Sequence, residues 1–217
     1  RVTMHEEGPV SLAADGETLV SYDFAELLTD GEIGLGSRNS VTHFDNIFIA
    51  PPPPPPAPTS LPFAEDFNDG VADSLAPRTG LWEVDDGRFA VVPFTDTDGI
   101  STVAVADPLP DDVEVQVTIR ADDVTPGRLS NAFVIFDYQG PYDFKFAGAY
   151  VASNRWLIGH RTSSEWVEDA TLTTIINAAT DYTLGVALHE TGDVSLSVNG
   201  TERLSHQFAD PLQDGQL

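Results

Sequence analysis

The stretch "VALHETGDVSLSVNGTERLSHQFADPLQDGQL", residues 186–217, decides the fold. It contains runs in which apolar and polar residues alternate, and Asn199-Gly200 lies between two of them. Alternation with a period of two is typical of half-buried strands, and Asn-Gly between two such runs is typical of a tight hairpin. The stretch therefore predicts antiparallel β structure.

The same stretch occurs a second time near the start of the chain, as "VTMHEEGPVSLAADGETLVSYDFAELLTDGEI", residues 2–33. The two copies align without a gap at a constant offset of 184 residues, and 14 of the 32 aligned positions are identical. Self-similarity at a fixed period is the signature of a repeat architecture. The sequence therefore predicts the C-terminal strands of one unit at 1–50, a linker at 51–60, and the next unit at 61–217, which lacks its last strand.

The first copy is followed by "GLGSRNSVTHFDNIFIAPPPPPPAPTS", residues 34–60. Proline fixes φ and has no N–H donor, so the run from Pro51 to Pro56 predicts a polyproline II helix with a rise of about 3.1 Å per residue. Such a linker is a semi-rigid spacer that holds neighbouring units roughly 25 Å apart. A docking motif for a proline-binding domain is the alternative for this segment.

The composition excludes several classes of partner. The chain has 217 residues, 41% of them hydrophobic, and a net charge of −25 with only ten Lys and Arg residues. Without a basic surface it is not expected to bind nucleic acid or an anionic membrane. It has no cysteine and no apolar run long enough for membrane insertion. An acidic surface suits solubility in high salt or in an environment rich in divalent cations.

Alternating runs continue along the second unit, with turn residues between them. They favour an all-β fold, an antiparallel two-sheet jelly-roll sandwich, with tandem units joined by the polyproline linker. The best helix candidate, residues 173–180, is short. The expected strands lie at 63–67, 88–94, 101–106, 113–120, 132–138, 144–152, 155–161, 182–189, 194–198 and 203–208.

Three segments carry a resemblance to a known superfamily: "LPFAEDFNDG" with "WEVDDGRFAV", "FDYQGPYDFKFAGAYVASNRWLIGHR", and "GLGSRNSVTHFDNIFI". They resemble the concanavalin A-like lectin/glucanase superfamily, and within it the laminin-G-like modules repeated in large bacterial surface proteins. The resemblance implies that the first and last strands of each unit pair as neighbours. It also implies that a structural Ca²⁺ joins these two strands.

The sequence does not carry the motifs of the catalytic members. Glucanases of this superfamily have a strand with Glu-x-Asp-x-Glu, which places two catalytic carboxylates on one face. "WEVDDG" (82–87) lacks the third acid, and "EWVEDA" (165–170) has the wrong spacing. The sequence therefore predicts that the chain is not an enzyme.

Clusters of oxygen ligands make Ca²⁺ the expected cofactor. The segment "EDFNDG" lies beside the first predicted strand, and Ca²⁺ takes six to eight oxygen ligands. Asp-Gly pairs are also ordinary turn residues, which is the alternative interpretation. The candidate ligands are Glu65, Asp66 and Asp69, with Asp45 from the preceding copy, and more weakly Asp96 and Asp98.

Aromatic and polar side chains in the middle of the unit are candidates for glycan binding. Sugar sites combine aromatic faces with a few orienting polar groups. Large aromatic residues also dominate sandwich cores, so Trp156 has a core interpretation as well. The candidates are Tyr138, Tyr142, Trp156, His160, Arg161 and Trp166.

These observations predict a non-catalytic structural or adhesive repeat of a secreted or surface-displayed bacterial fibre or adhesin. Its expected partners are neighbouring copies of the same module and, in addition, glycans. A missing last strand leaves a sheet edge that the following sequence fills in cis or another copy fills in trans. The alternative function is a carbohydrate-binding module attached to a larger enzyme or adhesin. Either function predicts an extracellular or cell-surface location.

Overall fold

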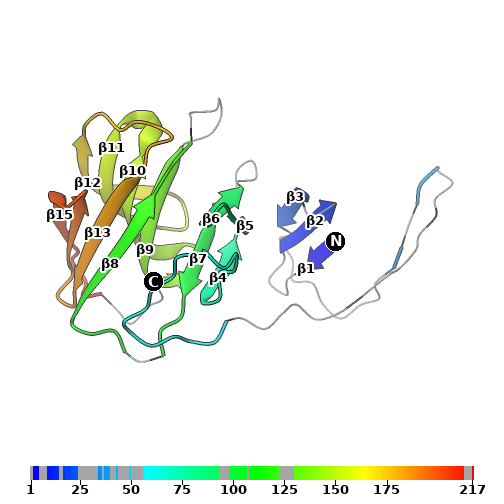
Figure 1. The fold of residues 1–217 in the computed structure, drawn as a ribbon, viewed down its shortest axis with the longest axis horizontal. Coiled ribbons are helices and arrows are strands. Elements are labelled where there is room, and N and C mark those ends of the chain that lie inside the picture. The colour runs from blue at the N-terminus through cyan, green and yellow to red at the C-terminus, as the bar shows by residue number, and fades with distance from the viewer. Residues whose placement is uncertain are drawn as a thin grey trace.

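The structure is a computed structural model. It describes residues 2–4, 9–14, 17–23, 34–35, 37–39, 43, 49, 56–92, 98–106, 108–122, 130–212 and 217. Figure 1 shows a β sandwich that is formed by the second part of the chain. The described residues contain no helix that is long and apolar enough to span a membrane.

Two four-stranded antiparallel sheets form the sandwich. Sheet I has the order β15-β14-β13-β8, and sheet II has the order β12-β11-β10-β9. The predicted all-β antiparallel sandwich is confirmed. The strands are β8 (Asp112–Ile119), β9 (Asn131–Gly140), β10 (Asp143–Tyr150), β11 (Arg155–Arg161), β12 (Trp166–Thr173), β13 (Tyr182–His189), β14 (Asp193–Val198) and β15 (Thr201–Gln207), with the single-turn helix η1 (Val151–Ser153) between β10 and β11.

The main core lies between the two sheets. Side chains of successive strand residues point to opposite faces, so Leu184 and Val186 of sheet I meet Phe136 and Ile158 of sheet II. All four are fully buried. Burial of apolar surface of this kind is the dominant favourable contribution to folding.

The opposite face of sheet II is also buried. Phe144, Phe146 and Leu157 form a second cluster with Ile100, which belongs to a separate two-stranded sheet. Because both of its faces are covered, the central strands of sheet II read as nearly continuous apolar runs. Two further antiparallel pairs lie outside the two main sheets: β4 (Leu75–Thr79) with β7 (Ile100–Val103), and the hairpin of β5 (Leu81–Asp85) with β6 (Arg88–Val92).

The start of the chain forms a sheet of its own. It consists of β1 (Val2–Met4), β2 (Pro9–Ala14) and β3 (Glu17–Asp23), in that order and antiparallel. These strands lie in the first copy of the sequence repeat, and the strands in the second copy are β13, β14 and β15.

The two copies have the same strand register. Val2 pairs with Leu12, and Val186 pairs with Leu196, at the offset of 184 that the sequence alignment gives. The pairing of β2 with β3 matches that of β14 with β15 in the same way, and both show a bulge directly after Leu12 or Leu196. A bulge re-aims a strand and disturbs the ladder, so its recurrence shows that the repeat extends to local backbone geometry.

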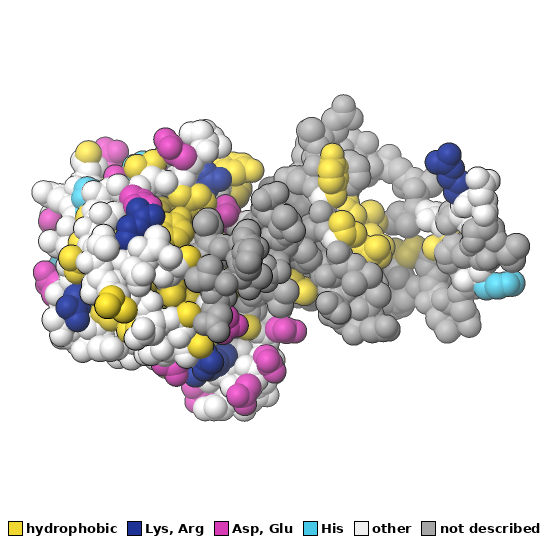
Figure 2. All heavy atoms as spheres, turned by 90° about the horizontal axis from the view of Figure 1, so that it is seen from above, with side chains coloured by type: hydrophobic (Ala, Val, Ile, Leu, Met, Phe, Trp, Pro, Cys, Tyr) yellow, Lys and Arg dark blue, Asp and Glu magenta, His cyan; other side chains and the backbone are white. Residues whose placement is uncertain are grey.

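The two copies differ in what covers their apolar face. Val2 is 55% exposed and Leu12 is 42% exposed, whereas Val186 and Leu196 are 0% exposed. Figure 2 shows the hydrophobic side chains of this small sheet gathered at the surface. An exposed apolar face of this kind marks an interaction surface or a core without its partner.

Some elements differ from the sequence prediction. Residues 63–67 do not form a strand, because Phe67 has a φ of 57°. Residues 173–180 do not form a helix: β12 ends at Thr173 and an extended loop follows. Strands β4, β5 and β12 were not predicted. Residues 51–55 of the predicted polyproline linker lie outside the described residues.

Candidate functional site

Aromatic and charged side chains gather at one end of sheet II. The pairing of β11 with β12 sets Arg161 opposite Trp166, and Tyr138 and Tyr142 lie on and directly after β9. Together with Asp98, these four residues are called the aromatic surface below. They lie on the face of sheet II that is turned away from sheet I, because they continue the row of Phe144 and Phe146.

Trp166 packs against three phenylalanine side chains. Its ring centroid lies 4.8 Å from that of Phe146, 5.3 Å from that of Phe144 and 5.6 Å from that of Phe133. The first two contacts are edge-to-face, which is a preferred geometry of aromatic pairs. The indole is therefore preorganised, and it is half-buried rather than enclosed.

Arg161 lies between the two aromatic rings that flank it. Its guanidinium carbon is 5.2 Å from the centroid of Tyr142 and 5.8 Å from that of Trp166, within the range of cation–π attraction. Its Nη1 donates a hydrogen bond to the carbonyl oxygen of Thr162. Its Nε is buried, makes no hydrogen bond to any described residue, and lies 3.7 Å from Oδ2 of Asp98.

Asp98 connects the aromatic surface to the β4–β7 pair. Its Oδ2 accepts a hydrogen bond of 3.3 Å from Nε1 of Trp166, and its carbonyl oxygen accepts one of 2.7 Å from Oγ1 of Thr79. The backbone at Gly80 lies close to the backbone at Gly99, the residue after Asp98. This approach needs glycine at position 80, where φ is +82° and a Cβ atom would lie 2.9 Å from Cα of Gly99. Asp98 is therefore held in the aromatic surface by a closely packed backbone segment.

A second polar pair lies on the same face of sheet II. Arg155 Nη1 donates to Glu168 at 2.5 Å, and its guanidinium carbon lies 5.6 Å from the Tyr150 ring. Burial, and then the charge of Glu168, raise the pKa of Tyr150, while Arg155 opposes them. Tyr150 therefore keeps its hydroxyl proton to a higher pH than a free tyrosine does.

The structure separates the predicted glycan-binding residues into two groups. Tyr138, Tyr142, Arg161 and Trp166 share the aromatic surface. Trp156 does not belong to it, because strand alternation places it on the opposite face, where it is 3% exposed.

Trp156 and His160 face sheet I. Trp156 meets Tyr182 of the main core edge-on at a centroid distance of 5.4 Å. This corrects the prediction for Trp156 and favours its core interpretation. The ring of His160 lies on the same side, with Nδ1 2.7 Å from Oδ2 of Asp169.

The predicted calcium ligands are engaged in local turns. Glu65 accepts a hydrogen bond from the backbone N–H of Phe67 at 2.9 Å, and Asp66 accepts one from that of Asn68 at 3.0 Å. The hydrogen bonds from Asn68, backbone first, lower the pKa of Asp66. These are the contacts of the turn interpretation.

Asp69 follows the same pattern, with a hydrogen bond of 3.0 Å from the N–H of Val71. Within the described residues, no three Asp, Glu or His side chains are grouped so that they could hold a metal ion. Asp45 and Asp96 lie outside the described residues, and Asp98 belongs to the aromatic surface. Bound Ca²⁺ stays a prediction.

The sequence did not indicate the supporting residues of the site. Phe133 and Phe146 were expected only as strand residues, and Asp98 only as a weak metal ligand. Arg155 could have been found, because it shares the period-two row of Arg161 along β11. The role of Asp98 could not have been found, since it depends on the packing of two glycines.

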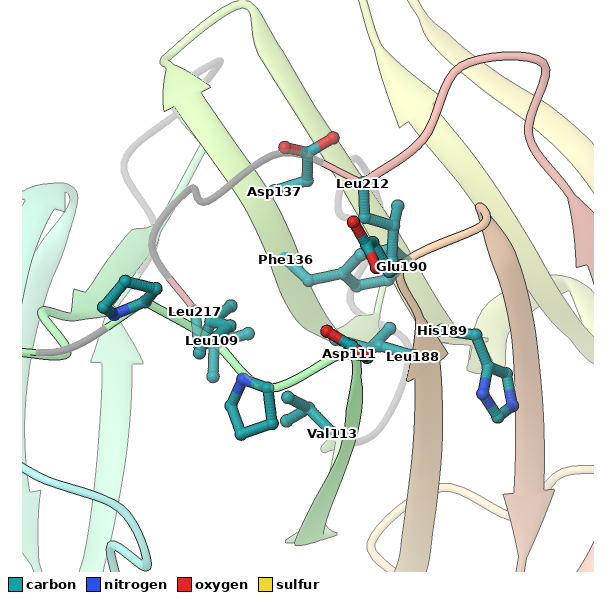
Figure 3. Close-up of a pocket in the computed structure, with 12 residues that line it drawn as sticks. Leu109, Asp111, Val113, Phe136, Asp137, Leu188, His189, Glu190, Leu212 and Leu217 are labelled. Atoms are coloured by element: carbon teal, nitrogen blue, oxygen red, sulfur yellow. The ribbon is translucent and has the colours of Figure 1, made fainter.

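A cavity of about 320 Å³ lies at another place, near the start of β8. Apolar and polar residues line it together, and one of them is the buried Asp137, whose carboxylate pairs with Lys145 and accepts a hydrogen bond from Gln139 at 3.2 Å. Figure 3 shows the Asp137 carboxylate directed away from Leu109 and Leu217. The lining residues are Pro108, Leu109, Pro110, Asp111, Val113, Phe136, Asp137, Leu188, His189, Glu190, Leu212 and Leu217.

Comparison with known proteins gives one informative likeness. No family model matches the chain, and no curated protein matches it. Among solved structures, the chain is similar to the carbohydrate-binding module CBM66 from Bacillus subtilis, with a TM-score of 0.53 and 12% sequence identity. The match covers 66% of this chain and 84% of that chain. The likeness shows the β-sandwich fold alone, and it singles out neither the concanavalin A-like superfamily nor the laminin-G group.

Proposed function

We propose that this chain is a non-catalytic carbohydrate-binding module that holds glycans at the aromatic surface. The single observation that carries the proposal is the preorganised group of Trp166, Tyr142 and Arg161 at one end of sheet II. The apolar faces of sugar rings stack on aromatic side chains, and sugar hydroxyls accept hydrogen bonds from groups such as the Arg161 guanidinium and donate them to groups such as the Asp98 carboxylate. The likeness in fold to a carbohydrate-binding module supports this proposal.

The proposal includes an extracellular location, where polysaccharides are encountered. It replaces the main prediction from the sequence by the alternative one. The adhesive or fibre-forming role stays a prediction, and what favours it is the repeat with its matched strand register. The two roles are compatible, because a glycan-binding module can itself be repeated along a chain.

Affinity measurements on the full chain test the proposal. A glycan array is used to find a ligand, and calorimetry then compares the wild type with Trp166→Ala and Tyr142→Ala. We expect each variant to bind at least about tenfold more weakly, a loss of ~1.4 kcal/mol. Circular dichroism checks that each variant stays folded.

Tyr22→Ala is the matched control, because Tyr22 is an exposed tyrosine on β3, outside the aromatic surface. It should bind like the wild type. The proposal is wrong if no glycan on a broad array binds, or if Tyr22→Ala weakens binding as much as Tyr142→Ala does.

A further inference from the structure

Strand β7 has one edge without a strand partner among the described residues. Its other edge pairs with β4. Past the end of β7, Thr59 lies on that same edge: its N–H donates to the carbonyl of Ala104 at 2.8 Å, and its carbonyl accepts from the N–H of Ala106 at 2.8 Å. Val103, the residue before Ala104, donates its N–H to the carbonyl of Leu217 at 2.6 Å. Successive residues of a strand direct their backbone groups to opposite edges. Leu217 therefore lies at the edge opposite Thr59.

The repeat shows which sequence belongs next to Leu217. Leu217 corresponds to Ile33 at the offset of 184 residues, and in the first copy Ile33 is followed by "GLGSRNSVTHFDNIFI", residues 34–49. The second half of this segment is rich in aromatic and β-branched residues, as strands are. Two apolar residues described within it, Leu35 and Ile49, are 56% and 61% exposed. Their side chains are therefore available to another surface.

A cavity adjoins Leu217 at this edge. Leu217 packs against the main core and lines the cavity of about 320 Å³ together with Leu109, Val113 and Leu212. Figure 3 shows Leu109 and Leu217 among the residues that line this cavity. A strand that continues from the position of Leu217 would begin beside this cavity, and its apolar side chains would have room there.

We propose that the free edge of β7 is an acceptor site for a strand, and that residues 34–49 of a second copy of this chain occupy it. Backbone hydrogen bonds to the edge supply affinity, and alternate side chains supply specificity, as in strand addition. Donation by residues 34–49 of the same chain is disfavoured for two reasons. The proline run between Ile49 and Thr59 is expected to be stiff. In addition, Thr59 is held at the opposite edge of β7.

A peptide with the sequence of residues 34–49 tests the site on the full chain. We expect saturable binding in calorimetry at one peptide per chain. We also expect amide hydrogen exchange at Ser101, which shares the free edge with Val103, to slow at least tenfold. The same peptide with Asn46→Pro lacks one N–H donor within the strand, and a scrambled peptide keeps only the composition. Both should bind at least tenfold more weakly.

Sedimentation of the full chain identifies the donor. We expect dimers or longer assemblies that appear with rising concentration and that the peptide dissociates. Absence of peptide binding, or binding that leaves exchange at Ser101 unchanged, overturns the acceptor site. A chain that stays monomeric at every concentration overturns the second copy as donor. Neither result depends on glycan binding, so the two proposals fail separately.

Discussion

Asp98 is the residue on which the geometry of the aromatic surface depends. Its carboxylate accepts from Trp166 and faces Arg161, and its backbone is held by Thr79. Without it, the indole N–H and the guanidinium each lose a partner at a half-buried position. The three phenylalanines still pack against Trp166 from the other side. We therefore expect a local loss of order at this end of the sheet and not unfolding of the domain.

Asp98→Ala should destabilise the fold by about 1 kcal/mol, because it removes a hydrogen bond and a nearby charge from a partly exposed site. It should also change the fluorescence of Trp166. Urea unfolding measures the first effect, and emission spectra measure the second. Asp210→Ala, at an exposed position, should stay within about 0.5 kcal/mol of the wild type. Equal stabilities for the two variants would contradict the role given to Asp98.

The pair of Arg88 and Asp181 gives a pH dependence. Arg88 donates to both carboxylate oxygens, at 3.1 and 3.0 Å, and these hydrogen bonds lower the pKa of Asp181 below its ordinary value of 3.8. A lowered pKa in the folded state means that the unfolded state binds more protons in acid. The pair therefore stabilises the protein above about pH 4, and this contribution is lost as the pH falls through the folded-state pKa.

Asp181→Asn should remove this contribution. Between about pH 5 and about pH 2, the unfolding temperature of the wild type should fall more steeply than that of the variant. Differential scanning calorimetry at several pH values measures both slopes. Asp122→Asn, at a carboxylate whose side chain is 93% exposed, should follow the wild type. Parallel curves for wild type and Asp181→Asn would show that the pair does not contribute.

At the scale of elements, the packing of sheet II leaves no room at some of its glycines. A Cβ atom at Gly159 would lie 2.1 Å from the carbonyl oxygen of Val167 and 2.7 Å from Cζ of Phe146. Gly159→Ala should therefore cost ~1–3 kcal/mol, as overpacking does. Gly140→Ala is the matched control, because nothing lies within 4 Å of its added Cβ atom. Urea unfolding compares them, and similar stabilities would show that β12 moves away freely.

Most strands of the sandwich could be predicted from the sequence because their alternation is strong. Strand β4 was missed because its sequence "LAPRT" contains Pro77, which argues against a strand, and β12 was missed because its bulge interrupts the alternation of "WVEDATLT". The expected strand at residues 63–67 fails because Phe67 adopts positive φ within a turn that the acidic side chains stabilise. Local hydrogen bonds of this kind override strand propensity.

The candidate site could be predicted in part. Residue type and position near strand ends single out Arg161 and Trp166 as candidates, and the structure sets them opposite each other as half-buried residues. Trp156 and Arg161 lie on opposite faces of β11 by the same parity, and the sequence alone does not say which face meets sheet I. The contribution of Asp98 depends on contacts between segments that are 68 residues apart, which no local pattern encodes.

At the scale of the whole molecule, the repeat places the same residue type, leucine, at equivalent positions in two different environments. Leu196 is buried in the main core, and its counterpart Leu12 is exposed on the isolated sheet. Leu196→Ala should cost ~2–5 kcal/mol through lost burial and a cavity. Leu12→Ala should change the main unfolding transition by less than about 0.5 kcal/mol. Thermal unfolding measures both, and a large effect of Leu12→Ala would mean that its sheet is covered in solution.

The matched register of the two copies also bears on how such a chain folds. The hairpin of β2 and β3 has pairing positions, spacing and a bulge equivalent to those of the hairpin of β14 and β15. While the chain folds, each hairpin therefore fits either of two equivalent positions. Tandem domains with this degree of likeness are prone to exchange segments while they fold. The proline run is expected to be stiff, and a stiff linker would keep each hairpin away from the equivalent position in the neighbouring unit, which limits such exchange.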